Sequence, residues 1–162
     1  MASSKPDWMT YVKFETPILF RAIWQDRSLL DPYHGIYLFS VGAGKLTPAS
    51  RHAGRPDEEK MQDGDVLYVG ITQNADGFRG RFGDEYLRKD PTAATGKMPR
   101  RAVLMLQGWM LDPVIGSRLY VRFAPLEGDR RLLEDLETAI LQFYGAPLNQ
   151  SKQNSMTPFD DM

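Results

Sequence analysis

One carboxylate stands among apolar side chains on the last helix that the sequence predicts. Asp129 can cap the start of this helix, Gly145 can end it, and Pro147 follows at the usual distance. At about 100° per residue, the apolar side chains between these limits occupy one half of the helical wheel, and Glu137 lies inside that half. Because burying an uncompensated charge costs several kcal/mol, Glu137 needs a partner. That partner is either an arginine or a metal ion.

Phosphate chemistry needs cations, and the arginines are the candidates. The chain has 20 Lys and Arg against 21 Asp and Glu, a net charge of -1, whereas nucleic-acid-binding domains are usually basic. Any attraction to phosphate must therefore be local. Six arginines recur within a short stretch and either converge on one face or are scattered solvated charges: Arg100, Arg101, Arg118, Arg122, Arg130 and Arg131.

Residue types exclude several other classes of protein. With Cys 0, the chain has no thiolate nucleophile, disulfide framework or cysteine-bound zinc, which favours a reducing, cytoplasmic location. His34 and His52 have no partner at metal-ligand spacing, so we expect neither to be catalytic. No run approaches the roughly 18 apolar residues of a membrane-spanning helix, and the first residues lack the order of a secretory signal. We expect no association with a membrane.

Three segments are typical of β-strands. Residues 35–41 form a β-branched and aromatic run bounded by glycine, and residues 65–71 form a second such run. In the segment 118–126, Leu119, Val121 and Phe123 alternate with more polar residues, which predicts one buried face.

Helices are predicted before, between and after these strands. The segment from Pro17 to Leu30 has apolar residues at mixed helical spacing. A second helix starts near Asp76 and carries an aromatic stripe, and a third spans Pro99 to Leu111.

The length of 162 residues suits a single domain with one core. Residues 1–34 form an N-terminal extension, about 35–150 the core, and 151–162 a polar tail. We therefore expect an α+β fold in a single unit, 1–162.

Two of the strands carry tripeptides that match a known nuclease family. The first holds Gly35-Ile36-Tyr37 and the second Tyr68-Val69-Gly70. With these motifs the chain resembles the GIY-YIG nuclease family, which includes homing endonucleases, some restriction enzymes and the incision subunit of bacterial nucleotide excision repair. The resemblance implies a small three-stranded antiparallel sheet flanked by helices, here with an extra N-terminal helix and a helical insertion.

Three further positions extend the resemblance. Arg81 matches the family's arginine on the helix after the second strand, with Arg79 as a nearby rival. Glu137 matches a glutamate on a later helix, and Asn149 matches an asparagine beyond it. The helical wheel singles out Glu137 independently of the resemblance.

The resemblance implies hydrolysis of a phosphodiester with Mg²⁺ or Mn²⁺. Glu137 would hold the ion, since a lone carboxylate with phosphate oxygens and water suits Mg²⁺. Arg81 would bind the scissile phosphate, because its planar fork matches two oxygens. Tyr37 would take a proton from the attacking water, Tyr68 would orient water or phosphate, and Asn149 would brace the site by hydrogen bonds. We expect Glu137 to face the two phenols and Arg81 and to be open to an ion and a phosphate.

The chain departs from the family pattern at several places. Ile71 stands where several relatives carry lysine, and Glu85, four residues after Arg81, stands where relatives often carry an aromatic residue or histidine. Tyr86, one residue further, can serve instead. The resemblance covers neither the N-terminal segment nor residues 90–117.

The arginines near these motifs are candidate substrate contacts. The loop over residues 42–64 is an insertion relative to the compact family pattern. It is either an inert excursion or a contact to substrate in which Arg51, His52 and Arg55 face phosphates. Arg79 and Arg122 are further candidates for binding phosphate.

Each of these residues also has a purely structural interpretation. Tyr37 and Tyr68 are ordinary core aromatics in it, Arg81 pairs with Glu85, or Arg81 forms a structural salt bridge with Glu137. Two functions therefore remain: a metal-dependent endonuclease, with DNA as the expected substrate, and a catalytically inactive nucleic-acid-binding or protein-interaction module. The near-neutral charge favours either a protein partner or homodimer that adds affinity, or recognition of a special DNA structure or a modified base.

Overall fold

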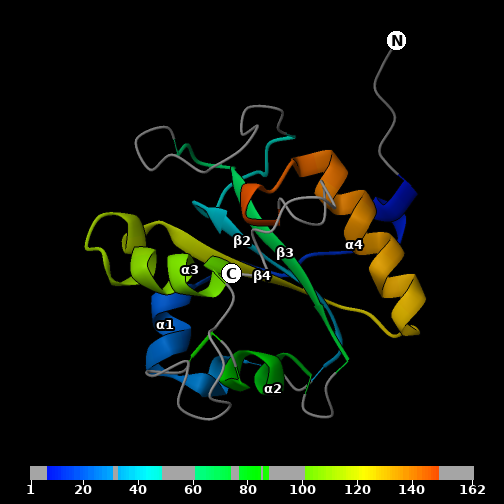
Figure 1. The fold of residues 1–162 in the computed structure, drawn as a ribbon, viewed down its shortest axis with the longest axis horizontal. Helices are drawn as coiled ribbons and strands as arrows, with labels where there is room; N and C mark the ends of the chain where they lie inside the picture. The colour runs from blue at the N-terminus through cyan, green and yellow to red at the C-terminus, as the bar shows by residue number, and fades with distance from the viewer. Residues whose placement is uncertain are drawn as a thin grey trace.

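A single antiparallel sheet carries helices on both of its faces (Figure 1). The computed structural model describes residues 7–30, 33–48, 61–73, 77–84, 86–87 and 101–149. The predicted α+β class is confirmed. None of the described helices combines the length and the hydrophobicity needed to cross a bilayer.

The sheet has one strand more than the three that were predicted. Its strands are β1 (Ile18–Leu19), β2 (Gly35–Val41), β3 (Val66–Thr72) and β4 (Leu119–Pro125), in the spatial order β1-β4-β2-β3. The two residues of β1 pair with β4, and the N–H of Glu15 donates to the carbonyl of Phe123 at 2.8 Å. The N-terminal segment thereby satisfies backbone groups that β4 would otherwise expose at its edge.

The helix predicted from Pro17 to Leu30 is shorter than expected. It consists of α1 (Phe20–Gln25), followed by the 3-10 turn η2 (Arg27–Leu29). Asp26 between them is extended, and its carboxylate accepts a hydrogen bond from the N–H of Ser28 at 3.0 Å. Such a bond from side chain to backbone competes with helix continuation.

The last helix, α4 (Arg130–Tyr144), begins and ends as predicted. Asp129 accepts a hydrogen bond from the N–H of Leu132 at 2.8 Å, and Gly145 ends the helix with a left-handed φ of 66°. The remaining helical elements are η1 (Asp7–Thr10), α2 (Gly77–Asp84), α3 (Arg101–Leu111), η4 (Ile115–Ser117) and η5 (Pro147–Asn149).

Strand alternation sends neighbouring residues of β2 to opposite faces of the sheet. Tyr37 and Phe39 belong to a core cluster with residues of α1, α2 and α3, whereas Ile36 and Leu38 belong to a second cluster with residues of α4 and η1. The prediction of one buried face for β4 is therefore incomplete. Arg122, on the other face of that strand, is buried too, and its guanidinium interacts electrostatically with Tyr144 at the end of α4.

Candidate active site

The two glycine-containing tripeptides lie side by side on β2 and β3. Tyr37 pairs with Gly70 across the strands. A Cβ at Gly70 would overlap the phenol ring of Tyr37, so a residue without a side chain is required beneath this ring. Gly35 has a φ of 151°, and a Cβ there would overlap the carbonyl of Ala124. For steric reasons, both positions therefore require glycine.

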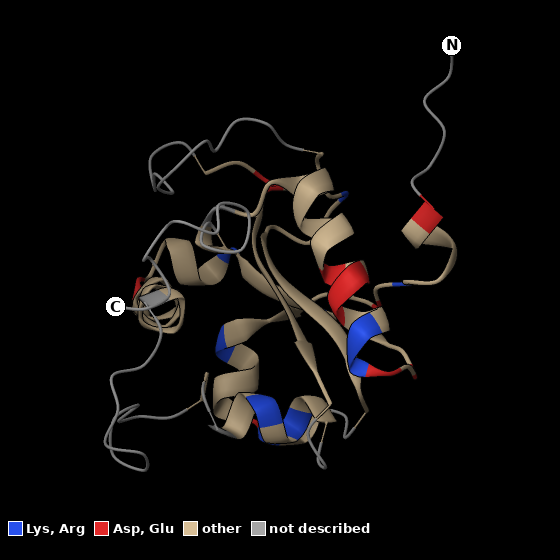
Figure 2. Ribbon diagram, turned by 45° about the vertical axis from the view of Figure 1, so that its right-hand side comes forward, with Lys and Arg blue, Asp and Glu red and all other residues tan. Residues whose placement is uncertain are grey.

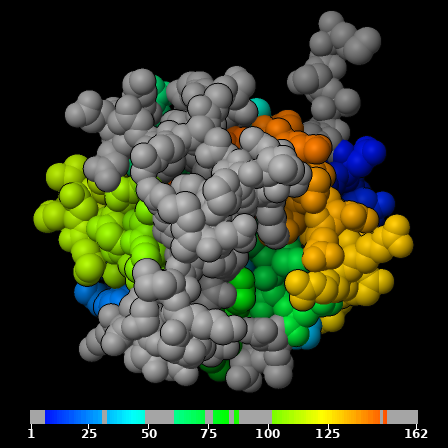
Figure 3. Space-filling view, viewed as in Figure 1, coloured from blue at the N-terminus to red at the C-terminus, as the bar shows by residue number. Residues whose placement is uncertain are grey.

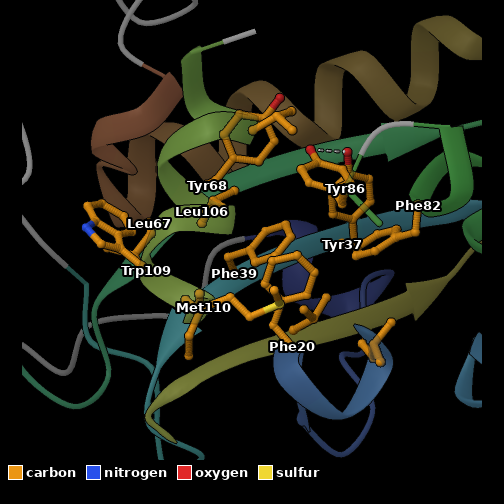
Figure 4. Packing of buried hydrophobic residues seen from close by; sticks show 14 of the residues in the cluster. Phe20, Tyr37, Phe39, Leu67, Tyr68, Phe82, Tyr86, Leu106, Trp109 and Met110 are labelled. Carbon is orange, nitrogen blue, oxygen red and sulfur yellow. Dashed lines mark hydrogen bonds between the residues drawn. The ribbon is translucent and has the colours of Figure 1, made fainter. Parts of the chain in front are cut away.

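Three phenol side chains gather on the face of the sheet that α2 covers (Figure 4). The hydroxyls of Tyr37 and Tyr86 are 2.8 Å apart and share a hydrogen bond. The ring centroids of Tyr86 and Tyr68 are 6.4 Å apart. Phe82 of α2 packs against this group, with its ring centroid 5.1 Å from that of Tyr37. Tyr86 thus directly contacts the tyrosine that we expected to act as a base.

The two candidate arginines of α2 have different surroundings. Arg79 is exposed, and its Nε and Nη2 donate to the carbonyl of Leu30 at 3.2 and 2.8 Å. Arg81 lies about 200° further around the helix and is half-buried. In Figure 2, where Lys and Arg are blue, basic residues are visible on α2 and, separately, on the first turn of α4. The hydrogen bonds to the Leu30 carbonyl give Arg79 a structural role, and the contact of Arg81 with a phosphate stays a prediction.

Glu137 lies on the buried face of α4, beside apolar residues of the core cluster on that side of the sheet. Trp8 of η1 packs against Phe143 and Tyr144, with its ring centroid 5.7 and 5.9 Å from theirs. Glu137 is seven positions before Tyr144, which places the two within about 20° of each other around the helix axis. Glu137 therefore shares the buried face of α4 with Tyr144.

Asn149 connects the end of α4 to the edge strand. Its Oδ1 accepts a hydrogen bond from the N–H of Val69 at 2.8 Å, and its Nδ2 donates to the carbonyl of Val69 at 2.9 Å. Ala146 belongs to the core cluster on the α4 side and Leu148 to the cluster on the other side. The chain therefore crosses the edge of β3 after α4, at the tripeptide that contains Tyr68.

The structure brings the phenols together but places a strand between them and α4. Tyr37 and Tyr68 lie on the face of α2, Glu137 belongs to the helix on the opposite face, and β3 contacts both helices. In the space-filling view, green residues of the stretch from β3 to α2 lie beside the yellow and orange residues of α4 (Figure 3). The expected opening is absent, since Glu137 and Tyr68 are 3% exposed and Tyr37 is 0% exposed. Substrate access to these groups requires a local movement.

Arg122 is hydrogen-bonded to the end of β2 and to the turn that follows it. It donates to the hydroxyl of Ser40 at 3.2 Å and to the carbonyls of Gly42 at 3.3 Å and Gly44 at 2.5 Å. It is 9% exposed, and burial lowers the pKa of its guanidinium. It also lies on the face of β4 opposite to the phenols. Arg122 therefore supports the turn after β2, and we do not retain it as a substrate contact.

The stems of the predicted loop 42–64 are joined by a hydrogen bond from the N–H of Thr47 to the carbonyl of Gly64 at 2.9 Å. The tip of the loop lies outside the described residues, and so do Arg51 and Arg55. Their contact with phosphate stays a prediction.

The metal-ligating side chains of the described residues form no group of three or more. Glu137 is therefore considered as a single protein ligand. A tetrahedral structural zinc site needs four protein ligands, whereas Mg²⁺ keeps several waters and binds one or two carboxylates together with substrate phosphates. A carboxylate is a donor of the type that Mg²⁺ or Mn²⁺ accepts, but Glu137 is 3% exposed and already interacts within the chain.

Sequence reasoning did not single out Gln107 of α3. Its Nε2 donates to the carbonyl of Tyr86 at 2.9 Å, in a buried contact. A glutamine within an apolar helix signals an inward polar contact but does not identify the partner.

Comparisons with known proteins give no match: no protein-family model, no curated protein and no solved structure corresponds to this chain.

Proposed function

We propose that this chain is a metal-dependent endonuclease of the GIY-YIG type that hydrolyses phosphodiester bonds, with DNA as the expected substrate. The observation that carries the proposal is the pair of hydrogen bonds between Asn149 and Val69. These bonds join the segment after α4 to the strand that holds Tyr68-Val69-Gly70, which pairs with the strand that holds Gly35-Ile36-Tyr37. Motifs far apart in the sequence thereby meet around one edge strand.

Tyr37 and Tyr86 together supply the proton-transfer group of the proposed reaction. Tyr37 acts as the base in its deprotonated form, whose negatively charged oxygen takes a proton from the attacking water and becomes a neutral hydroxyl. The hydroxyl of Tyr86, 2.8 Å away, can donate a hydrogen bond to that oxygen and stabilise the charge. Tyr68, from the neighbouring strand, orients the water or the phosphate.

Arg81 and Glu137 belong to α2 and α4, the two helices that contact β3. Arg81 binds the scissile phosphate through its planar, permanently charged guanidinium. Glu137 would hold Mg²⁺ or Mn²⁺, which when bound neutralises charge on the phosphoryl and leaving oxygens. Because Tyr37, Tyr68 and Glu137 are covered, binding of the substrate strand along β3 must separate the layers locally.

The proposal is tested by incubating the purified chain with supercoiled plasmid DNA, and in parallel with structured RNA, in the presence of Mg²⁺ or Mn²⁺. We expect nicking or linearisation of the DNA that stops in EDTA. Glu137→Gln should abolish cleavage, because the amide keeps the shape of the side chain and loses its charge. Glu134→Gln, at an exposed position of the same helix, should cleave like wild type. Wild-type activity equal to that of Glu137→Gln would refute the proposal.

A second candidate is favoured by the burial of the site. Glu137, Tyr37 and Tyr68 are almost fully covered, as core residues of an inactive binding module would be. In that case the chain would bind nucleic acid or a protein without cleaving. Glu137→Gln would then bind DNA as wild type does in a filter-binding assay, and neither protein would produce a cut.

A further inference from the structure

The backbone at Tyr86 is held by side chains from two other parts of the chain. The Nε2 of Gln107, on α3, donates to the carbonyl of Tyr86 at 2.9 Å. The Nη2 of Arg27, on η2, donates to the carbonyl of Leu87 at 3.2 Å. The N–H of Leu87 donates in turn to the carbonyl of Phe82 at 2.9 Å, which ties the segment to the end of α2.

Ring packing alone does not fix the distance between the Tyr86 hydroxyl and the Tyr37 hydroxyl. The centroids of Phe82 and Phe39 lie 4.7 and 5.1 Å from that of Tyr86, and they hold its ring from the sides. Such ring contacts form over centroid separations of about 4.5–7 Å, which is a wider range than a hydrogen bond allows. A hydrogen bond between hydroxyls tolerates only a few tenths of an ångström, since its usual range is about 2.5–3.0 Å. The distance of 2.8 Å to Tyr37 therefore depends on where the backbone of Tyr86 is anchored.

Both anchoring side chains come from regions that the family resemblance does not cover. Gln107 belongs to the segment 90–117 and Arg27 to the N-terminal extension.

We infer that Gln107 is a positioning residue, whose hydrogen bond to the Tyr86 carbonyl holds the Tyr86 hydroxyl against the hydroxyl of Tyr37. Arg27 supports the same segment through Leu87. The effect on catalysis rests on the proposed function, but the positioning of the phenols does not.

The positioning is tested without any cleavage by ¹⁹F NMR of the full chain labelled with 3-fluorotyrosine. Tyr37→Phe and Tyr86→Phe assign the two signals. Gln107→Leu keeps the approximate volume and removes the donor, and we expect it to shift both signals while the exposed Tyr11 does not move. Gln142→Leu, at an exposed position of α4, is the control and should shift neither signal.

A second variant covers the case in which Gln107→Leu fails to fold, which thermal unfolding would reveal. Arg27→Gln should shift the same two signals by a smaller amount, because Arg27 acts one residue further along. If both signals keep their wild-type positions in whichever of these variants folds, the inference is wrong.

Measurements of kcat and KM test whether the positioning of Tyr86 by Gln107 matters for the proposed reaction. Gln107→Leu should lower kcat by about 10- to 100-fold, as expected for misplacement of a reacting group by about 1 Å, and leave KM unchanged. An unchanged kcat would refute a role in the reaction. If the wild-type chain does not cleave at all, the proposed function fails, whereas the NMR result still decides whether Gln107 positions Tyr86.

Discussion

The side chain of Asn149 makes both of its hydrogen bonds with a single residue, Val69, accepting from its N–H at 2.8 Å and donating to its carbonyl at 2.9 Å. In an antiparallel strand the N–H and C=O of one residue point to the same side, so Asn149 pairs with the side of β3 that faces away from β2. The amide thus replaces a neighbouring strand at this position. It also links the end of α4 to the proposed catalytic strand.

Asn149→Ala should leave two buried backbone groups of Val69 without this partner. We expect a loss of about 1–3 kcal/mol in the free energy of unfolding for each group that stays unsatisfied. Urea denaturation measures the loss, with Gln142→Ala at an exposed position as the control. A loss no larger than that of the control would show that the pair does not stabilise the fold.

Gly70→Ala should destabilise the chain because its Cβ overlaps the ring of Tyr37. Overpacking of this kind costs about 1–3 kcal/mol. Gly44→Ala is the matched control, since a Cβ there meets no atom within 4 Å. Thermal unfolding should show a lower Tm for Gly70→Ala than for wild type, and an unchanged Tm for Gly44→Ala. If Gly70→Ala has the same Tm as Gly44→Ala, the close packing of Tyr37 on Gly70 is contradicted.

Gly108→Ala should stabilise the chain. Gly108 lies inside α3, is exposed, and leaves open space where a Cβ would stand. Alanine is favoured over glycine in a helix by about 0.8–1.0 kcal/mol. A denaturation midpoint that does not rise would mean that this helix position is not formed in solution.

Tyr37→Phe and Tyr86→Phe should each destabilise the chain by about 1–3 kcal/mol, because each leaves a buried hydroxyl without its partner. The double variant removes both hydroxyls and should lose less than the sum of the single losses. A double-mutant cycle by urea denaturation measures this difference. Strict additivity would show that the two hydroxyls do not interact.

Stability should fall in acid partly because of Asp112. Hydrogen bonds from the N–H groups of Ile115 and Val114 to its carboxylate lower its pKa below the ordinary value of an aspartate. The contribution is fully present at pH values above the pKa of the unfolded chain. It is lost as the pH falls through the pKa of the folded chain. Asp112→Asn should therefore show a weaker dependence of Tm on pH in this acidic range than wild type, and equal slopes would contradict the assignment.

The residue pattern was sufficient to predict α4, because its stop and start signals and its apolar periodicity are local. The pattern also indicated β2, β3 and β4, and it identified Glu137 as a carboxylate within an apolar helix face. The predicted helix at Pro17 to Leu30 was partly wrong, because Ile18 and Leu19 pair with a strand about 100 residues away in the sequence. Periodicity within one segment contains no information about such a distant partner.

By itself, the sequence determined which residues carry the possible chemistry and which elements hold them, since side-chain type and periodicity are properties of neighbouring residues. Only the tertiary structure decided that Tyr86 contacts Tyr37, that Asn149 contacts Val69, and that β3 separates the phenols from α4. The same packing decided that Glu137 is covered. These outcomes depend on the order of the strands and on the layers above and below them, which form only when distant segments exclude water together.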